Sequence, residues 1–324
     1  MLVNLEEASA LLQRGEVVAI PTETVYGLAA DATNEVALRQ IYVVKERPAD
    51  NPLIVHIGDI SHVNNWAAEF SPLAQKLAQA FWPGPFTLVL PAKSHVSMVI
   101  RANEPTVALR VPNHPLTLQL LKQSGLSVAA PSANKYTQLS PTTAAHVAAG
   151  LGDAVHVLDG GACTVGIEST IVSVVGDDWV LLRHGMISED AITALAGKSA
   201  IKTLQTLPKA PGQHLLHYSP RTPLILCADI AELNGFLQTH FLANKTCAAL
   251  IFGESEEFGE NKAPQNCFTI TLPVEPAAAA EQLYSALHTL DSLGVDTLLV
   301  ALPPNTPIWA AVLDRLTRAG YSKE

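Results

Sequence analysis

Cysteine is scarce in this chain of 324 residues, and the four that occur, Cys163, Cys227, Cys247 and Cys267, stand far apart. No two of them form a Cys-x-x-Cys pair, so the sequence predicts reduced cytoplasmic thiols rather than a zinc site or a disulfide framework. The N-terminus has acids early and no long apolar core, which argues against a signal peptide. No apolar run reaches the roughly 18 residues that a membrane span requires.

Charged residues are also few. They make up 15% of the chain, and the formal net charge is −10. Long-range attraction to nucleic acid is therefore weak, and an RNA binder of this charge would need a local basic face. Hydrophobic residues make up 48%, which is ample for large cores and argues against disorder. We expect a soluble cytoplasmic α/β protein with one large domain or two of ordinary size.

The order of apolar segments predicts two domains. Over residues 1–206, runs of strand length alternate with helical patterns, and some strands follow one another directly, which predicts a mixed sheet covered by helices. Four prolines between positions 208 and 223 predict an extended linker at residues 207–222. The alternation restarts over residues 223–324, where it predicts a smaller α/β domain.

Local signals mark several boundaries. The run PTETVYGL, residues 21–28, is interpreted as a polar loop between a buried strand and a helix that Asn34 caps. Ser140 before Pro141 predicts the start of a later helix. The acidic residues 253–261 are interpreted as a loop.

One stretch concentrates polar groups between apolar runs. Lys45 and Arg47 stand two apart, close to Asn51 and Pro52. Phosphate oxygens favour arginine forks and lysine point charges, so the pair fits a clamp for a polyphosphate. It fits equally well a solvated helix C-terminus, where cations suit the helix dipole. Asn51 is either a turn residue or an amide donor to phosphate.

Other polar residues adjoin predicted strands. Arg110 lies within an apolar strand, where a charge costs free energy unless it is paired, and few acids are near in sequence, so a bound carboxylate is a reasonable partner. Ser132 and Asn134 directly follow another strand, either as a strand-ending turn or as ligand groups at its carboxyl end. Ser140 is a helix cap whose helix N-terminus also suits phosphate.

Several chemistries find no support. The glycine-containing residues 160–170 lack the lysine of a P-loop, because Ile167 occupies that position. His214 and His217 have no evident third partner for a metal site. No nucleophile–base triad emerges from the sequence.

Seven segments taken together resemble the YrdC family. They are PTETVYGL, KxRP followed by NPL, WPGPFTLVL, VALRVPNHP, APSAN followed by SPTTA, GIESTIV and LLRHG. The resemblance implies a YrdC-type twisted mixed sheet. The proline-rich linker and the added C-terminal segment resemble the longer members, which implies a smaller Rossmann-like C-terminal domain.

The resemblance also implies site residues. Lys45 and Arg47 would be the catalytic cations, facing the polyphosphate. The residues implied to contact ATP are Lys45, Arg47, Asn51, Thr106, Ser132, Asn134, Ser140, Arg183 and Tyr218. The residues implied to contact L-threonine are Thr24, His56, Arg110, Ala130 and Ser169. No protein ligand for a metal is implied, and Mg²⁺ is expected to arrive with ATP. Where this chain reads HLLHYSP, the family more often has a HYAP run that contains Lys or Arg, and Tyr218 lies in this departing run.

The implied activity is synthesis of threonylcarbamoyl-adenylate from L-threonine, bicarbonate and ATP, with release of pyrophosphate and water. The product would feed the threonylcarbamoyl transferase machinery that modifies tRNA, with at most a weak tRNA contact and no membrane partner. Residues 207–222 would act as a lid that excludes water. The alternative is an RNA-binding or maturation module without the activity. A hydrogenase-maturation carbamoyltransferase would need zinc-finger and acylphosphatase modules, which this sequence lacks.

Overall fold

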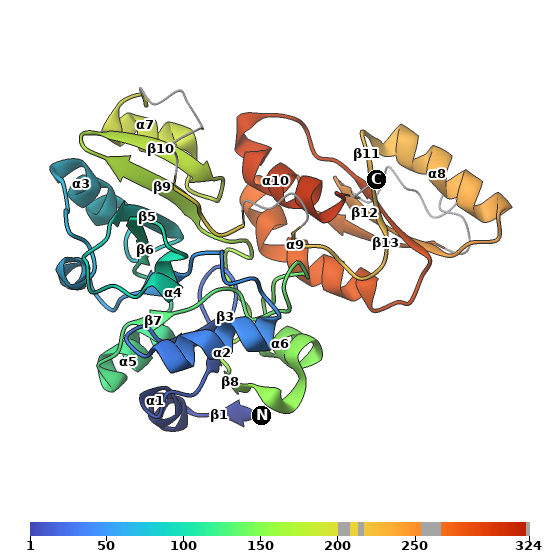
Figure 1. The fold of residues 1–324 in the computed structure, drawn as a ribbon. Helices are drawn as coiled ribbons and strands as arrows, with labels where there is room; N and C mark the ends of the chain where they lie inside the picture. The colour runs from blue at the N-terminus through green and yellow to red at the C-terminus, as the bar shows by residue number, and fades with distance from the viewer. Residues whose placement is uncertain (200–207, 213–216, 254–266, 322–324) are drawn as a thin grey trace. The chain divides into compact units, whose positions relative to one another are not determined.

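The computed structural model describes residues 1–199, 208–212, 217–253 and 267–321 (Figure 1). The chain divides into two compact units. Unit 1 consists of Met1–Tyr136, Pro141–Thr164 and Glu168–Gln213, and unit 2 consists of Thr137–Ser140, Val165–Ile167 and His214–Glu324. Two short segments from within the span of unit 1 therefore belong to unit 2. The linear domain boundaries at residues 206 and 223 stay a prediction.

Unit 1 is built on a mixed sheet. Among the described residues the strand order is β1-β8-β2-β3-β7-β4-β6-β5-β9-β10. The strands are β1 (Leu2–Val3), β2 (Val18–Ile20), β3 (Gly27–Asp31), β4 (Ile54–His56), β5 (Phe86–Pro91), β6 (Thr106–Arg110), β7 (Val128–Ala129), β8 (His156–Leu158), β9 (Thr170–Val175) and β10 (Asp178–Arg183). The central strand β4 pairs parallel with β6 and antiparallel with β7, and β5 pairs antiparallel with β6 and parallel with β9. This confirms the expected mixed sheet.

Helices of unit 1 begin where the sequence provides capping side chains. Asn4 and Glu7 form a capping box at the first helix, Asn34 caps the second and Ser71 the third, each accepting from a free backbone N–H of the first turn. The helices are α1 (Leu5–Gln13), α2 (Glu35–Lys45), α3 (Pro72–Phe81), α4 (Met98–Arg101), α5 (Pro115–Ser124), α6 (Ala144–Leu151) and α7 (Glu189–Ala196), with 3₁₀ turns η1 (Ile60–Asn65) and η2 (Gly152–Ala154). They pack against the sheet, as α2 does on β3 and α3 on β5.

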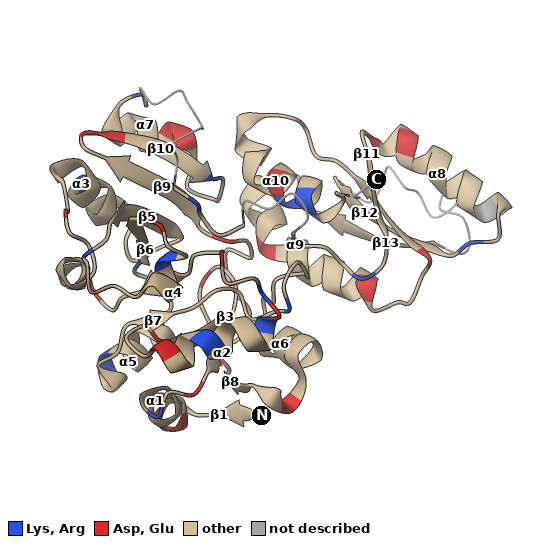
Figure 2. Ribbon diagram, in the orientation of Figure 1, with Lys and Arg blue, Asp and Glu red and all other residues tan. Residues whose placement is uncertain are grey.

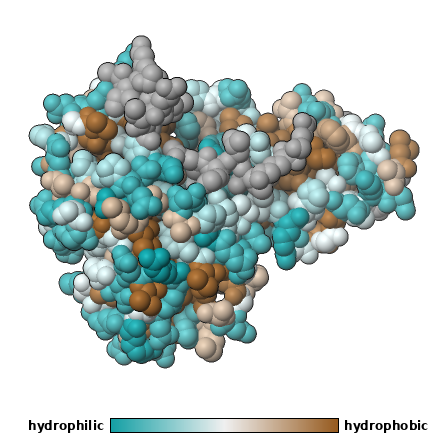
Figure 3. All heavy atoms as spheres, in the orientation of Figure 1, coloured by the Kyte–Doolittle hydropathy of each residue, from teal (hydrophilic) through white to brown (hydrophobic). Residues whose placement is uncertain are grey.

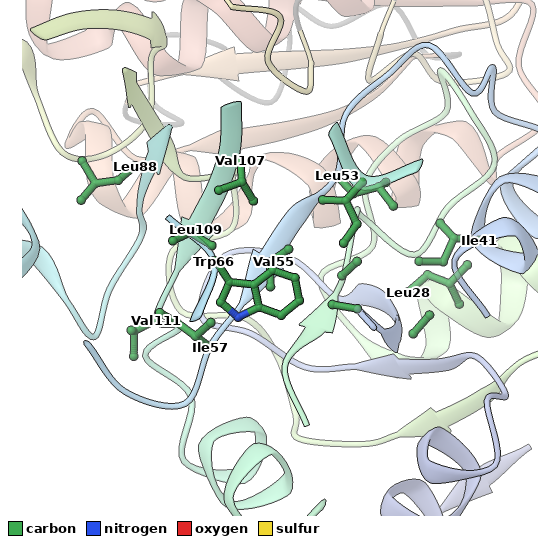
Figure 4. Close-up of a cluster of buried hydrophobic side chains, with 14 of the residues drawn as sticks. Leu28, Ile41, Leu53, Val55, Ile57, Trp66, Leu88, Val107, Leu109 and Val111 are labelled. Carbon is green, nitrogen blue, oxygen red and sulfur yellow. The ribbon is translucent and has the colours of Figure 1, made fainter. Parts of the chain in front are cut away.

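The core of unit 1 lies between these layers. Figure 4 shows Val55 of β4 and Leu109 of β6 close to the ring of Trp66, together with Leu53 and Val107. All five side chains are buried. Continuous apolar runs in β4 and β6 are typical of strands that are covered on both faces, and they give the central strands a rigid setting for the polar residues at their ends.

Unit 2 contains a parallel sheet of order β11-β14-β12-β13 in the part of the chain that is described. Its elements are β11 (Leu224–Cys227), α8 (Ile230–Leu242), β12 (Cys247–Phe252), β13 (Cys267–Leu272), α9 (Pro276–Asp291), β14 (Thr297–Ala301), η5 (Pro307–Trp309) and α10 (Ala310–Ala319). A parallel sheet whose strands are interspersed with helices α8, α9 and α10 confirms the Rossmann-like unit expected here. Leu233, Leu237, Ile251 and Leu299 form part of its core.

Two local predictions were wrong. The stretch interpreted as a loop up to residue 28 gives way to strand β3, because Gly27 to Ala29 pair with β2 and Ala30 and Asp31 pair with β7. The helix expected at Ser140-Pro141 begins later, at α6, and its cap is Thr143, whose side chain accepts from the His146 N–H.

Two further predictions fall partly outside the description. The acidic loop lies there except for Gly253, and the linker does at residue 207 and residues 213–216. Among the described residues, no helix combines the length and hydrophobicity that spanning a membrane requires. On the face drawn in Figure 3, hydrophilic residues cover much of the surface and hydrophobic ones form smaller groups.

Candidate functional site

Arg110 is the centre of a buried polar cluster in unit 1. It ends β6 and is only 4% exposed. Its Nη1 donates to Oγ1 of Thr24 at 2.9 Å, its Nε donates to the Gly84 carbonyl at 3.2 Å, and its Nη2 lies 2.8 Å from Oε1 of Glu23. The last contact has the distance of an ion pair without the angle of a hydrogen bond. We call Glu23, Thr24, His56 and Arg110 the arginine–glutamate cluster.

A tight turn before β3 presents Glu23 and Thr24. The Thr22 hydroxyl donates to the Val25 carbonyl at 2.6 Å and accepts from the N–H groups of Thr24 and Val25, both at 3.2 Å. Thr22 and Thr24 also share a hydroxyl hydrogen bond of 2.9 Å. Glu23 and Thr24 are buried at 3% and 0% exposure. These local bonds fix the direction of both side chains toward Arg110.

His56 completes the cluster from the neighbouring strand. It ends β4, and its register partners are Arg110 on β6 and Val128 on β7. Burial, and secondly the charge of Arg110, lower the pKa of its imidazole to about 3. His56 is therefore neutral at physiological pH, and it can exchange hydrogen bonds with a ligand without adding charge.

Lys45 is the centre of a second cluster. Lys45 ends α2, as the helix-terminus interpretation expected, but its side chain is only 2% exposed, so the expected solvation was wrong. Its Nζ donates to the carbonyl of Ser132 at 2.5 Å and to that of Asn134 at 2.6 Å. Burial lowers its pKa well below the ordinary value; Arg47 lowers it further and Glu168 opposes this. The lysine thus joins two sequence motifs that are 87 residues apart.

Arg47 and Asn51 lie in the chain between α2 and β4. Arg47 is 8% exposed and its Nη2 donates to the Pro52 carbonyl at 3.1 Å. Asn51 donates its amide to the Asp50 carboxylate at 3.0 Å, and it shares a hydrogen bond with the hydroxyl of Tyr136. Burial raises the pKa of Tyr136, so its hydroxyl stays protonated. We call Lys45, Arg47, Asn51, Ser132 and Asn134 the lysine–arginine cluster.

A third group lies on the neighbouring strands. Ser169, directly before β9, shares a hydroxyl hydrogen bond of 2.8 Å with Thr87 of β5. Arg183, at the end of β10, donates from Nη2 to the Ser169 hydroxyl at 3.1 Å and from Nε to its carbonyl at 3.0 Å. Its Nη1 donates to the carbonyl of Pro211 at 3.1 Å. The structure therefore joins Ser169 with Arg183, which the sequence had assigned to different substrates.

The remaining assigned residues of unit 1 lie at strand ends. The N–H of Ala130 donates to the Ile54 carbonyl at 3.1 Å, which ties the end of β7 to the start of β4. Thr106 begins β6 and Arg110 ends it, so four residues of strand, roughly 13 Å, separate them. Thr106 and Arg110, which are implied to contact different substrates, thus lie at opposite ends of β6.

Two residues assigned to ATP belong to unit 2. Ser140 is fully buried, and its carbonyl is 3.1 Å from the ring Nε2 of His288. Tyr218 is 2% exposed with φ of 60°, and the Arg315 guanidinium lies 5.0 Å over its ring. His217 packs edge-on against the same ring at 4.1 Å. The structure does not bring these two together with the clusters of unit 1 within one unit.

Sequence reasoning missed three members of these groups. Glu23 was seen only as part of a turn; the sequence suggested a bound carboxylate as the partner of Arg110, and the structure adds Glu23 as an ion-pair partner within the chain. Thr87 and Tyr136 gave no signal, since hydroxyls in apolar strands and loops are common. A charged residue between two threonines of an otherwise apolar segment was the available clue for Glu23.

Possible metal ligands, the distribution of Lys and Arg, and one cavity are further signs by which other kinds of site would be recognised. Among the described residues, no group of three or more His, Cys, Asp or Glu side chains lies in a position to hold a metal ion. Lys and Arg form short, scattered segments in Figure 2. A cavity of about 860 Å³ lies in unit 2 beside Phe252, Leu302 and Leu313, and no predicted site residue lines it.

Comparison with known proteins identifies both parts of the chain. Residues 10–185 match the family described as Telomere recombination, Sua5/YciO/YrdC, and residues 187–320 match the family described as Threonylcarbamoyl-AMP synthase, C-terminal domain. Threonylcarbamoyl-AMP synthase of Bacillus subtilis is 39% identical over 98% of this chain and 92% of its own length. The protein of that name from Pyrococcus abyssi is 36% identical over 97% of this chain and 93% of its own length.

A solved structure extends the likeness to three dimensions. The crystal structure of P. abyssi Sua5 complexed with L-threonine has a TM-score of 0.90 and 32% identity, covering 99% of this chain and 97% of that one. The similarity therefore spans both units rather than the first alone.

Proposed function

Because this chain belongs to the threonylcarbamoyl-AMP synthase family, an enzyme family of the nucleotidyltransferase type, we propose that it makes threonylcarbamoyl-AMP from L-threonine, bicarbonate and ATP. Pyrophosphate and water are the other products. The observation that carries the proposal is the pair of buried clusters around Arg110 and Lys45, which offer one site for an amino acid and another for a polyphosphate.

The arginine–glutamate cluster binds L-threonine. Arg110 takes the substrate carboxylate, because a guanidinium offers several donors in a fixed plane. The Thr24 hydroxyl and the neutral His56 ring lie beside it and recognise polar groups of the amino acid. Ser169 and the apolar Ala130 complete the proposed threonine set, with Ala130 limiting the space for the side chain.

The lysine–arginine cluster binds the phosphates of ATP. Lys45 and Arg47 donate to backbone carbonyls. Burial lowers the pKa of Lys45, and the negative charge of bound phosphates would favour its protonated form. Asn51, Ser132 and Asn134 add amide and hydroxyl groups. Thr106, Ser140, Arg183 and Tyr218 are proposed to contact the rest of the nucleotide.

The proposed reaction uses the residues of both clusters in two steps. The threonine amine first becomes a carbamate, and a carbamate oxygen then attacks the α-phosphorus of ATP, with pyrophosphate leaving. Lys45 and Arg47 stabilise the charge that grows on the leaving phosphates, so catalysis is mainly positioning and electrostatics. Mg²⁺, carried by ATP, would neutralise phosphate charge in the same place.

The linker at residues 207–222 is proposed to exclude water from the intermediate. Its described part reaches the site, because the Pro211 carbonyl accepts from Arg183. We place the reaction in the cytoplasm, where its product would serve the threonylcarbamoyl transferase machinery for tRNA. The scattered cations in the described ribbon offer no support for the alternative of an RNA-binding module.

The test is an assay of pure protein with ATP, Mg²⁺, bicarbonate and L-threonine. Pyrophosphate release should require both threonine and bicarbonate, and threonylcarbamoyl-AMP should accumulate in the same amount. The proposal is wrong if release is no faster with threonine than without it.

A further inference from the structure

Glu23 is a buried carboxylate with unused hydrogen-bonding capacity. It is 3% exposed, and within the described ranges neither of its oxygens accepts a hydrogen bond. Its one ion-pair contact, to Nη2 of Arg110 at 2.8 Å, has poor hydrogen-bond geometry. Buried carboxylates normally accept several hydrogen bonds, because losing hydration is costly. The unfilled acceptor sites of Glu23 therefore point to donors supplied by a ligand.

The neighbours of Glu23 define the shape of that ligand. A carboxylate, a guanidinium and a hydroxyl lie side by side, from Glu23, Arg110 and Thr24. An α-amino acid carries the complementary ammonium and carboxylate on adjacent atoms. Arg110 alone attracts any carboxylic acid, whereas the pair of opposite charges selects one that also carries a cationic amine.

Other ionisable groups also surround Glu23. His114, which precedes α5, and Cys163, in the loop after β8, both interact electrostatically with it. Burial lowers the pKa of His114 and raises that of the Cys163 thiol to about 12, so both are uncharged near neutral pH. His56, the register partner of Arg110, is neutral as well. Arg110 is thus the single cation among these described neighbours, and Glu23 is free to attract a second.

We propose that Glu23 binds the ammonium group of L-threonine and accepts a proton from it when the amine is carboxylated. This inference rests on the proposed function. Carboxylation requires the neutral amine, because an ammonium has no lone pair. The ammonium gives one proton to the Glu23 carboxylate, the nitrogen lone pair forms the N–C bond to the bicarbonate carbon, and hydroxide leaves that carbon. The second amine proton converts the hydroxide to water, and the carbamate remains.

The balance is complete without another reactant. Threonine with its ammonium and bicarbonate give carbamate, water and one proton, and Glu23 later returns that proton to solvent. A carboxylate beside the amine supplies the base where it is needed, in contact with the reacting atom. The role makes Glu23 a catalytic residue, whereas Thr22 positions it through the turn.

The test measures amine recognition directly by calorimetry. L-Threonine is compared with (2S,3R)-2,3-dihydroxybutyrate, which has a hydroxyl in place of the ammonium. The wild type should bind threonine at least about 30-fold more tightly, since charged hydrogen bonds are worth this much. In Glu23→Gln the preference should fall to within about 3-fold, because the amide keeps the shape and loses the charge. An equal loss for both compounds would show that Glu23 only holds Arg110, and would overturn the proposal.

A second variant guards against misfolding of the first. Glu23→Asp keeps the charge but withdraws it by one methylene, so it should keep a preference of about 10-fold while threonine-dependent turnover falls at least 10-fold. Loss of the preference in this variant would also overturn the proposal. Glu16→Gln, on an exposed ion pair with Arg14, is the matched control and should change neither quantity.

The synthase activity and the role of Glu23 can fail separately. If the wild type prefers threonine over the hydroxy acid but releases no threonine-dependent pyrophosphate, the synthase proposal fails and amine recognition stands. If the wild type is an active synthase and Glu23→Gln keeps both its preference and its turnover, the role of Glu23 fails alone.

Discussion

The arginine–glutamate cluster and the lysine–arginine cluster both bury basic side chains in unit 1, but the groups that contact these side chains differ. Arg110 lies against the carboxylate of Glu23, so the pair has no net charge. Lys45 and Arg47 donate to carbonyls of Ser132, Asn134 and Pro52, and burial lowers the pKa of Lys45. Although the basic side chains of both clusters are buried, the two clusters therefore present different electrostatic environments to a ligand.

This difference matches the two proposed substrates. A neutral pair suits an amino acid, whose own charges cancel, and it gives little attraction to a simple anion. Donors oriented by carbonyls suit the phosphates of ATP, whose negative charge would favour the protonated form of Lys45, as Glu168 does. The comparison predicts that changes in one cluster affect one substrate, and the following variants test this separation.

The largest effect is expected from Arg110→Lys. A lysine keeps the charge but cannot reach Glu23, Thr24 and the Gly84 carbonyl together, since it lacks the planar fork. We expect the KM for threonine to rise about 100-fold, equivalent to about 2.7 kcal/mol, with the KM for ATP within about 3-fold of wild type. Steady-state kinetics with each substrate varied will check this. Arg101→Lys, at a buried arginine that donates to the Val96 carbonyl, is the control.

Removal of the cation at Lys45 should have the next largest effect, and on the other substrate. Lys45→Met loses the charge and leaves the carbonyls of Ser132 and Asn134 without this donor. We expect kcat/KM for ATP to fall about 50-fold, from one charge-assisted hydrogen bond of about 2.3 kcal/mol. Threonine binding by calorimetry should be nearly unchanged. Lys122→Met, on the exposed face of α5, serves as control; equal weakening of both substrates would contradict the separation.

The pH dependence of stability should report on the neutral histidine. The pKa of His56 is about 3 in the folded chain and ordinary in the unfolded chain, so between these values only the unfolded state takes up the proton. The contribution of neutral His56 to the free energy of unfolding is therefore fully present above about pH 6.5, and it is lost as the pH falls toward 3. Between pH 7 and pH 5 the wild type should lose about 2 kcal/mol more than His56→Gln in urea unfolding. Parallel curves would show that His56 is protonated in the folded state.

Much of the fold could be predicted from the sequence because the signals for where helices begin are local. Asn34 and Ser71 cap the helices that they predicted, since a side chain reaches an N–H two or three residues away. The strand at Gly27 to Asp31 was missed because its small residues have little intrinsic strand preference, and pairing with β2 and β7 decides it. The helix start predicted at Ser140 was wrong for a related reason: Ser140 is buried in unit 2, and the helix begins after it with Thr143 as its cap.

The site was predictable by residue type and less so by partner. The resemblance pointed to Arg110, Lys45 and Arg47, and the structure shows that all three side chains are buried. No sequence pattern pairs Arg110 with Glu23, because the ion pair forms only when the turn before β3 meets the end of β6 across the sheet. The same holds for the contact of Ser169 with Arg183. Long-range contacts of this kind depend on strand order, which one sequence does not encode locally.

The smallest effect tests a residue that resemblance did not name. Tyr136→Phe removes a hydroxyl that shares a hydrogen bond with Asn51, and it leaves Lys45 and Arg47 in place. Because the raised pKa keeps this hydroxyl neutral, the loss is that of one neutral hydrogen bond, about 1 kcal/mol. The KM for ATP should rise about 5-fold while threonine binding stays the same, and Tyr321→Phe, at an exposed ring, should change neither. A larger effect on threonine than on ATP would mean that Asn51 serves the arginine–glutamate cluster, and the division between the two clusters would have to be redrawn.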